Sequence, residues 1–315
     1  MTRDEPVTSP VLVLVGPTAI GKTALSLEIA ETFRCEIISM DSMQVYRHMD
    51  IGTAKVNREE QQKITHHLID IVDPDEQYDA ARFVRDALQA IKKIVARGKI
   101  PLITGGTGLY LSSLVNGMFD TLHVSQEIRD HLRQRLQGEG RDVLHRELMA
   151  IDRESGLRIH INDTQRLLRG LEIFYATGLP WSEHLRYQKE STRHPCFSRI
   201  LLLGLTCDRE LLYDRIKIRT IRMMQDAFAK EVEHLLSKGY AKDLTAMQSI
   251  GYRHMLACLN GEWDRETATA ALVRDTRRYA KRQMTWFKNQ QQLQWYDIER
   301  TDEVLISIEN FFQNI

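Results

Sequence analysis

A glycine-rich loop near the N-terminus carries the residues best suited to chemistry. Gly16-Pro17-Thr18-Ala19-Ile20-Gly21-Lys22-Thr23 fits the pattern G-x-x-x-x-G-K-[ST], a nucleotide-binding and ATP-binding motif. The glycines let backbone N–H groups turn inward around phosphate oxygens, and a helix that begins after the loop adds a positive field. Lys22 can neutralise phosphate charge, and the Thr23 hydroxyl can hold Mg²⁺. The loop therefore predicts a site for a phosphate chain and Mg²⁺, without specifying a reaction.

A carboxylate closes the next predicted strand. Asp41 ends the run EIISMD, whose residues 36–40 favour a buried strand. In that position it could bind Mg²⁺ beside the phosphate chain, or it could act as a general base that takes a proton from a nucleophile. Asp is also a preferred helix cap, which would be a purely structural role. The residue types alone leave these three roles open.

These residues need a scaffold of alternating strands and helices. Residues 11–15, 36–40 and 100–104 are short apolar runs typical of strands buried in a parallel sheet, and residues 81–97 have apolar side chains at helical spacing. Such alternation predicts βαβ units. We therefore expect an α/β fold, P-loop NTPase-like, in which helices flank a parallel sheet.

The middle of the chain has a different character. Residues 118–198 show only helical patterns, of which 164–177 is a clear amphipathic example, before residues 199–205 return as a buried strand. The simplest explanation is a helical insertion between two strands of one sheet. We therefore predict a core domain made of residues 1–117 and 199–315 and an all-helical insertion domain at 118–198.

One predicted helix near the C-terminus is strongly basic. Residues 274–288 hold six Lys or Arg side chains against one acid. On a helical wheel the apolar residues gather on one side, where they can pack into the protein. The basic side chains gather on the other: Arg274, Arg277, Arg278, Lys281, Arg282 and Lys288. So few acids are interleaved with them that the face favours an anionic partner.

Composition limits the classes of protein that fit. The chain has 43 basic and 43 acidic residues, so a polyanion would have to bind a local basic surface. The longest apolar run is too short for a membrane span, and the N-terminus lacks the apolar core of a signal peptide. Four cysteines without a CxxC pair favour a reducing compartment. We expect a cytoplasmic protein with no membrane partner, and a monomer, because no large apolar helix stripe lacks a core partner.

Seven motifs, in this order, carry a resemblance to a known family. The sequence resembles the bacterial tRNA dimethylallyltransferases (tRNA isopentenyltransferases) over nearly its whole length. A series of motifs is far more specific than the phosphate loop alone. The motifs are GPTAIGKT (16–23), ISMDSMQVYRHMDIGTAK (38–55), HHLIDIVDP (66–74), GGTGLY (105–110), NDTQRLLRGLE (162–172), SIGYR (249–253) and YAKRQMTWF (279–287).

The resemblance implies an enzyme that transfers dimethylallyl from dimethylallyl diphosphate to the N6 amine of the adenosine immediately 3′ of the anticodon in tRNA. It assigns Asp41 as the general base, Thr107 as a contact to the target nucleotide, and Arg219 as a diphosphate-binding arginine of the reaction channel. The loop 16–23 would bind the diphosphate, with Thr23 also on Mg²⁺.

The resemblance also implies a broad contact with the tRNA anticodon stem-loop, which the helical insertion would grip. The residues assigned to this contact are Asp41, Ser42, Met43, Gln44, Thr107, Arg129, Gln165, Arg166, Leu167, Leu168, Arg169, Gln248, Ser249, Ile250, Gly251, Tyr252, Arg253, Lys281, Arg282, Gln283, Met284, Thr285, Trp286, Phe287 and Lys288.

The chain departs from the family's pattern at three positions. Arg47-His48 stands where the family usually has a glycine, Val56 replaces a frequent proline, and Ala227 replaces a common glycine. None of these residues is assigned to chemistry. We therefore expect altered loops rather than lost activity.

Three other functions compete with tRNA prenylation. A small-molecule P-loop kinase would use ATP, but no arginine- or cysteine-rich lid is evident beside an adenine pocket. A catalytically silent module could hold RNA through the basic helix. An enzyme that prenylates free adenine nucleotides would not need to grip an anticodon, so the helical insertion and the basic segment favour tRNA.

Overall fold

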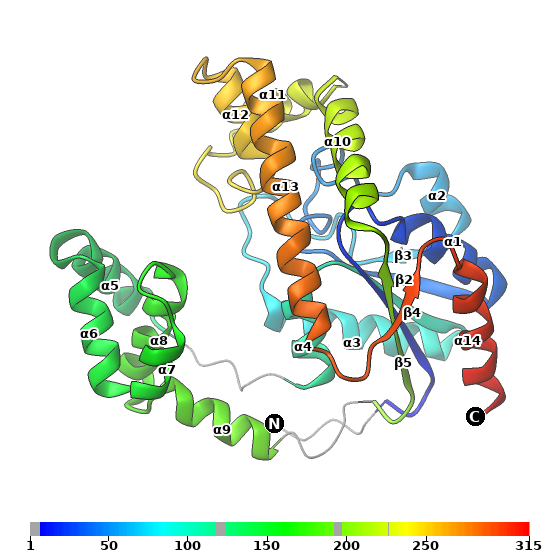
Figure 1. The fold of residues 1–315 in the computed structure, drawn as a ribbon, viewed down its shortest axis with the longest axis horizontal. Coiled ribbons are helices and arrows are strands. Elements are labelled where there is room, and N and C mark those ends of the chain that lie inside the picture. The colour runs from blue at the N-terminus through cyan, green and yellow to red at the C-terminus, as the bar shows by residue number, and fades with distance from the viewer. Residues whose placement is uncertain (1–6, 118–123, 192–196, 226, 315) are drawn as a thin grey trace. The chain divides into compact units, whose positions relative to one another are not determined.

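The structure is a computed structural model that describes residues 7–117, 124–191, 197–225 and 227–314. It divides the chain into two compact units, Met1–Ser113 with Phe197–Ile315, and Leu114–Cys196 (Figure 1). The sequence placed these changes a few residues later, after residues 117 and 198. Residues 118–123 and 192–196, beside both predicted boundaries, lie outside the description.

A parallel sheet forms the centre of the first unit. Within the described residues it has six strands in the order β3-β2-β4-β1-β5-β6, and every neighbouring pair is parallel. This confirms the P-loop NTPase-like α/β fold. The two edge strands were not predicted, because they are too short to show an alternating pattern. The strands are β1 (Val11–Val15), β2 (Cys35–Met40), β3 (His66–His67), β4 (Ile100–Gly105), β5 (Ile200–Thr206) and β6 (Gln294–Asp297).

Helices of the first unit pack on this sheet and on one another. Strand β1 is completely buried, as its run of valine and leucine predicts, and its leucines share a core with Ile29, Ile216 and Ala280 from three different helices. The helices are α1 (Lys22–Thr32), α2 (Arg58–Lys63), α3 (Ala80–Ala96), α4 (Gly108–Val115), α10 (Arg209–Gln225), α11 (Phe228–Ser237), α12 (Tyr252–Leu259), α13 (Arg265–Lys288) and α14 (Thr301–Gln313).

The second unit is helical in its described residues and has a core of its own. Leu132, Leu144, Leu148, Leu167 and Leu171 are completely buried in one cluster. The clear amphipathic pattern of residues 164–177 is confirmed as one helix of those same bounds. The helices are α5 (Gln126–Glu139), α6 (Arg141–Ile151), α7 (Arg153–Arg158), α8 (Thr164–Thr177) and α9 (Trp181–Ser191).

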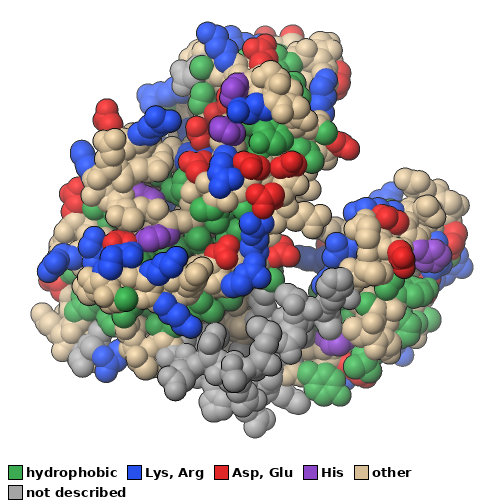
Figure 2. All heavy atoms as spheres, turned by 180° about the vertical axis from the view of Figure 1, so that it is seen from behind, with side chains coloured by type: hydrophobic (Ala, Val, Ile, Leu, Met, Phe, Trp, Pro, Cys, Tyr) green, Lys and Arg blue, Asp and Glu red, His purple; other side chains and the backbone are tan. Residues whose placement is uncertain are grey.

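The described surface offers little that points to a membrane or a metal cluster. None of its helices combines the length and apolarity that crossing a membrane would need. It contains no group of three His, Cys, Asp or Glu side chains placed to hold a metal ion. Figure 2 shows basic and acidic side chains interspersed over one face, in keeping with the balanced charge.

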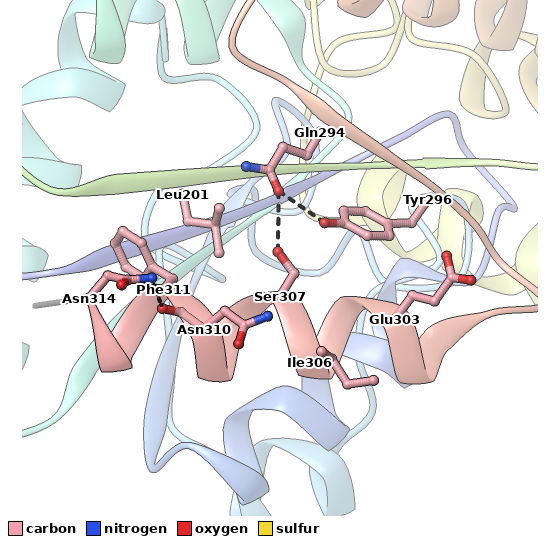
Figure 3. Close-up of a pocket in the computed structure, with 9 residues that line it drawn as sticks. All are labelled: Leu201, Gln294, Tyr296, Glu303, Ile306, Ser307, Asn310, Phe311 and Asn314. Atoms are coloured by element: carbon pink, nitrogen blue, oxygen red, sulfur yellow. Dashed lines mark hydrogen bonds between the residues drawn. The ribbon is translucent and has the colours of Figure 1, made fainter.

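A groove of about 450 Å³ lies between β6 and α14 at the edge of the sheet (Figure 3). The Gln294 side-chain oxygen accepts hydrogen bonds from the hydroxyls of Tyr296, at 2.9 Å, and Ser307, at 3.2 Å. These bonds fasten the edge strand to the last helix. The groove is thus explained by the packing of the C-terminal segment.

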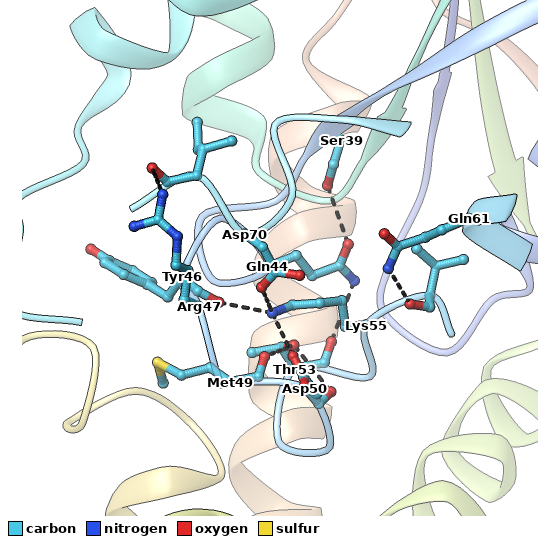
Figure 4. A network of polar contacts seen from close by, with 12 residues as sticks. Ser39, Gln44, Tyr46, Arg47, Met49, Asp50, Thr53, Lys55, Gln61 and Asp70 are labelled. Atoms are coloured by element: carbon cyan, nitrogen blue, oxygen red, sulfur yellow. Dashed lines mark hydrogen bonds and ion pairs between the residues drawn. The ribbon is translucent and has the colours of Figure 1, made fainter. Parts of the chain in front are cut away.

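The loop after Asp41 is held by a buried lysine. The Lys55 ammonium, whose side chain is only 3% exposed, donates to the Tyr46 carbonyl at 2.8 Å and pairs with Asp50 at 2.7 Å and Asp70 at 2.5 Å (Figure 4). A buried ammonium is stable only where its donors are paired. Lys55 therefore fixes the path of residues 46–55.

Glu231 on α11 fastens the same loop from a distant part of the chain. Its carboxylate accepts hydrogen bonds from the backbone N–H groups of Asp50, Ile51 and Gly52 at 2.7–3.1 Å, and from the Tyr252 hydroxyl at 2.6 Å. The approach is close, because a Cβ on Gly52 would lie 2.5 Å from the ring of Tyr252. One carboxylate thus ties α11 and α12 to the loop that begins at Asp41.

Glu231→Gln should lower the free energy of unfolding by about 1–3 kcal/mol, the cost of leaving a buried donor unpaired, because an amide NH₂ would face backbone N–H groups. Chemical denaturation measures this change. Tyr252→Phe removes only the hydroxyl bond and should cost less, about 1 kcal/mol. An unfolding curve for Glu231→Gln that superposes on that of the unsubstituted protein would contradict this role for the carboxylate.

The departures from the family's pattern fall into two kinds. His48 has φ of +65°, a left-handed conformation that suits glycine, so the missing glycine leaves local strain in the loop. Ala227 has φ of −74° and begins α11 without strain. The first position therefore carries a backbone cost, and the second carries none.

Candidate functional site

The carboxyl ends of three neighbouring strands create the site. Gly105, the last residue of β4, lies opposite Val15 of β1 on one side and Met40 of β2 on the other. The next residues of the three strands, Gly16, Asp41 and Gly106, therefore leave the sheet at one level. This register brings the phosphate loop, Asp41 and the GGTG segment to one edge, where ligands of open α/β sheets bind.

The loop 16–23 has the backbone expected of a phosphate site. Ala19 and Gly21 have φ of +67° and +113°, and α1 begins directly at Lys22. Alternating right- and left-handed residues turn successive N–H groups to one side. The Lys22 ammonium donates to the carbonyls of Gly16 and Pro17, each at 2.9 Å, and so uses two of its three donors.

Two arginines of α10 reach the loop. Arg219 donates to the Thr18 hydroxyl at 2.7 Å, and Arg215 donates to the Ile20 carbonyl at 2.9 Å. Burial lowers the pKa of Arg219, and the Asp41 carboxylate acts against that lowering. Arg219 thus contacts the loop directly. Arg215 is a loop contact that the sequence did not identify.

The charges of the site act on one another. Burial lowers the pKa of Lys22 from 10.5 to about 8, the nearby Asp41 carboxylate raises it in part, and the Arg219 guanidinium lowers it further. Asp41 is therefore within electrostatic reach of both cations. The phosphate loop, a carboxylate and two cations therefore form one electrostatic unit.

Asp41 shapes the backbone turn that follows it and keeps part of its side chain exposed. One of its carboxylate oxygens, Oδ1, accepts hydrogen bonds from the backbone N–H groups of Met43, at 2.8 Å, and Gln44, at 3.3 Å. These bonds shape a turn rather than a helix. The side chain is half-buried, and a carboxylate has further lone pairs on its second oxygen. The structural role therefore leaves the second carboxylate oxygen available for chemistry.

Thr107 is joined directly to the Asp41 segment. Its hydroxyl accepts a hydrogen bond from the Ser42 N–H at 3.2 Å, and its own N–H donates to the Met40 carbonyl at 3.4 Å. A Cβ on Gly105 would lie 2.1 Å from that Met40 carbonyl oxygen, so only glycine allows the two strands to end this close together. The GGTG segment therefore places Thr107 beside the carboxylate.

Gln283 of α13 links the phosphate loop to the GGTG segment. Its side-chain oxygen accepts from the Thr18 N–H at 2.9 Å, and its NH₂ group donates to the Gly106 carbonyl at 2.8 Å. Only 6% of Gln283 is exposed. The sequence placed this residue among tRNA contacts, whereas the structure gives it this bridging position. A polar side chain on the buried face of an amphipathic helix was the available signal, since it needs partners.

Tyr279, one turn before Gln283, completes the wall of the site. Burial raises the pKa of its hydroxyl, the Asp41 carboxylate raises it further, and hydrogen bonds with Thr107 and Gln283 oppose the shift. The phenol is thus a neutral hydrogen-bonding group beside Asp41. The sequence did not identify Tyr279 as a residue of the site.

The predicted tRNA-contact residues divide between the two units. In the first unit, residues 248–253 and 281–288 include Tyr252 and Phe287, whose side chains are completely buried. In the second unit, Arg129 is half-buried, whereas the Arg166 side chain is 70% exposed and pairs with Asp163 at 3.4 Å. Leu167 lies in the core of that unit. Within these stretches, only the exposed residues between the buried ones are accessible to RNA.

The donor groups of the loop suit Mg²⁺. This ion prefers oxygen ligands and keeps several waters, and it is commonly held by one or two protein groups together with substrate phosphates. Thr23, exposed in the first turn of α1, offers a hydroxyl beside the loop. Such a site needs no cluster of acidic side chains. The residues present therefore fit a Mg²⁺ ion that a bound phosphate chain would share.

Comparisons with known proteins give consistent results. A family model described as IPP transferase matches residues 44–290. A tRNA dimethylallyltransferase of Desulfotalea psychrophila is 51% identical over 301 residues, which are 96% of this chain and 95% of that protein. A tRNA dimethylallyltransferase of Acetivibrio thermocellus is 45% identical over 93% of each chain.

Solved structures give the same likeness in three dimensions. A eukaryotic dimethylallyltransferase acting on tRNA has a TM-score of 0.80 at 29% identity, over 98% of this chain and 80% of that one. The tRNA isopentenylpyrophosphate transferase of Bacillus halodurans has a TM-score of 0.70 at 36% identity, over 97% of both chains.

Proposed function

The chain belongs to the IPP transferase family, and on this premise we propose that it transfers dimethylallyl from dimethylallyl diphosphate to the N6 amine of the adenosine immediately 3′ of the anticodon in tRNA. The observation that carries the proposal is the strand register, which aligns Gly16, Asp41 and Gly106 at one edge of the sheet. A nucleophile activated by Asp41 would there meet a carbon whose diphosphate sits in the loop.

In this reaction the bond from the allylic carbon to the diphosphate oxygen breaks, and a bond from that carbon to N6 forms. Negative charge grows on the leaving diphosphate. The backbone N–H groups of the loop, together with Lys22 and Arg219, are placed to stabilise it. Mg²⁺, when bound at Thr23, would supply further positive charge to the same oxygens.

The amine loses a proton as the new bond forms. Asp41 accepts it, through the carboxylate oxygen that does not shape the turn. Thr107 and Tyr279 adjoin the carboxylate and can orient the base that carries the amine. The target adenine must leave its stack to reach this edge, which is cheaper in a single-stranded anticodon loop than in a duplex.

The similar proteins described above act on tRNA, and three further proposals follow from that substrate. We propose that the anticodon stem-loop contacts the exposed residues of the predicted stretches, that the helical insertion at 118–198 grips it, and that the protein works in the cytoplasm, where its tRNA substrate would be. The prediction of a monomer also stays a prediction.

One assay separates this function from the alternatives. Purified protein is incubated with labelled dimethylallyl diphosphate and Mg²⁺, and with unmodified tRNA, AMP or ATP in separate reactions. Label in tRNA alone is the expected result. Label in AMP or ATP, phosphate transfer from ATP, or retained RNA binding without turnover would each reject the proposal in favour of one of its competitors.

Gln283→Leu should raise the KM for dimethylallyl diphosphate about tenfold, because the Thr18 N–H and the Gly106 carbonyl would both be left unpaired at about 1–3 kcal/mol each. Steady-state kinetics with saturating tRNA measure the change. Gln283→Glu is the matched control: it keeps an acceptor for Thr18 but opposes the Gly106 carbonyl. If both variants bind the diphosphate substrate like the parent, Gln283 does not position the loop.

A further inference from the structure

A second basic site lies between α10 and α13, helices that pack side by side (Figure 1). It is a pocket of about 350 Å³. Besides two apolar residues of α13, the side chains that line it are Arg209, Tyr213, Arg274, Arg277, Arg278 and Lys281. Five cations therefore share one concave surface, and no carboxylate lines it.

Each helix turns this pocket away from the phosphate loop. Arg215 reaches the loop, whereas Tyr213 lines the pocket. Side chains two positions apart on a helix point about 200° apart around its axis. The same holds for α13, where Gln283 faces the loop and Lys281 lines the pocket. The pocket is therefore separate from the proposed catalytic site.

Tyr213 organises the cations. The guanidinium carbons of Arg209 and Arg277 lie 5.0 and 4.9 Å from the centroid of its ring, and Arg277 donates to the Tyr213 carbonyl at 3.4 Å. Cation–π contacts hold each arginine. They do not remove the repulsion between two guanidinium groups on one ring, so an anion between them would stabilise the arrangement.

Arg277 has a buried donor that lacks an acceptor among the described residues. The helical wheel placed it on the exposed basic face, but the structure shows it half-buried against α10, which corrects that prediction. Its Nε–H is buried and has no hydrogen-bond partner among the described residues. An unpaired buried donor of this kind costs about 1–3 kcal/mol, and an acceptor supplied by a ligand would remove that cost.

The ion pairs around the pocket also favour an anionic ligand. Asp275 pairs with Arg274 at 3.2 Å and with Arg278 at 3.6 Å, so two of the five cations are partly compensated. Within the part of the chain that the structure describes, Arg209, Arg277 and Lys281 have no ion pair. The guanidinium groups of Arg209 and Arg277 and the ammonium of Lys281 surround one cavity. Together they can donate to the several oxygens of a phosphate group.

We infer that this pocket binds a backbone phosphate of the tRNA substrate, outside the catalytic site. The inference rests on the proposed function. RNA is favoured over a free phosphate because Lys281 also begins the predicted tRNA-contact stretch 281–288, so the pocket continues that surface. The phosphate would fix the register of the tRNA on α13 without touching the target base.

The test measures tRNA binding by Arg209→Gln with Lys281→Gln, two exposed side chains whose replacement leaves the half-buried Arg277 in place. The dissociation constant for unmodified tRNA is measured from 50 to 300 mM salt. We expect the affinity at about 150 mM salt to fall about tenfold, and the slope of log K against log salt to fall by about 1–2, as for loss of one or two phosphate contacts. Lys217→Gln with Arg222→Gln, which removes two exposed cations of α10 outside the pocket, is the charge-matched control.

Each outcome decides the question. A salt slope that changes no more than in Lys217→Gln with Arg222→Gln overturns the inference. Calorimetry with inorganic diphosphate, in a Lys22→Met background that weakens the phosphate loop, tests a small anion. Diphosphate binding that the pocket substitutions abolish, without any effect on tRNA, would assign the pocket to a free phosphate instead. Because these are binding measurements, a protein that holds no tRNA at all defeats the proposed function, whereas an unchanged slope defeats only the pocket.

Discussion

Asp41→Asn should lower the rate of prenyl transfer about 10²- to 10⁴-fold, the usual worth of a positioned general base. The substitution is selective for chemistry. An asparagine oxygen can still accept the N–H groups of Met43 and Gln44, so the turn after β2 should keep its shape. What is lost is the basic oxygen that would take the N6 proton. Single-turnover kinetics with saturating tRNA measure the effect directly.

Asp41→Ala provides the comparison that separates the two roles. It removes both the base and the turn acceptor, so it should lose activity to the same extent and also unfold at a lower temperature. tRNA affinity should stay within about threefold of the parent in Asp41→Asn, because that variant keeps the turn. Should Asp41→Asn turn over within a factor of ten of the parent, proton removal by this carboxylate is not part of the reaction.

The sequence predicted those parts of the site that depend on residues close together in the chain. The loop 16–23 and Asp41 each follow a strand whose apolar run is plain, and parallel strands bring their carboxyl ends to one edge. That rule was enough to place a phosphate site and a carboxylate together. The resemblance then supplied Thr107, which the structure bonds to Ser42, and Arg219 of α10, which it bonds to Thr18 of the loop.

What the sequence could not predict depends on which helix packs against which. A helical wheel predicts that Arg277 is exposed, but it contains no information that Tyr213 of α10 packs against this side chain. It also shows Gln283 among buried neighbours without revealing that its partners are Thr18 and Gly106, far away in the chain. Non-local partners of this kind leave no periodic signal.

Asp41 shows a second limit. Of the three roles that the residue type leaves open, the helix cap is wrong, because Oδ1 instead accepts backbone N–H groups of a turn. This turn does not exclude catalysis. His48 shows the reverse. Its position was recognised as a departure from a glycine, and its left-handed backbone gives that departure a physical cost.

Lys22→Met should lower kcat/KM for dimethylallyl diphosphate about 10²- to 10³-fold, the range found when one preorganised group that stabilises developing charge is removed. Methionine keeps the length and apolar volume of the lysine stem without its charge. Steady-state kinetics with saturating tRNA measure the loss. Lys22→Arg, which keeps the charge but changes the donor geometry, should recover only part of it, because a planar fork cannot reach both carbonyls as the ammonium does.

The lowered pKa of Lys22 gives this prediction a dependence on pH. With a pKa of about 8, the ammonium is charged in the free protein below that pH and neutral above it. A bound diphosphate favours the charged form and raises the pKa. Binding above pH 8 must therefore take up a proton, and the affinity should fall by up to about tenfold per pH unit. Calorimetry at pH 8.5 in buffers of different ionisation enthalpy should detect the uptake, which Lys22→Met should abolish.

The lowered pKa of Lys22 also makes the stability of the folded protein depend on pH. In the unfolded chain Lys22 has its ordinary pKa of 10.5, so below pH 8 both states are charged and folding bears the full cost of burying the ammonium. As pH rises from 8 toward 10.5, only the folded state loses its proton, and that cost disappears. The melting temperature of the parent should therefore rise relative to that of Lys22→Met over this window, whatever the offset at pH 7. A difference that stays constant from pH 7 to 10 would mean that the ammonium is not held in a desolvated loop, and the explanation for its catalytic charge would fail with it.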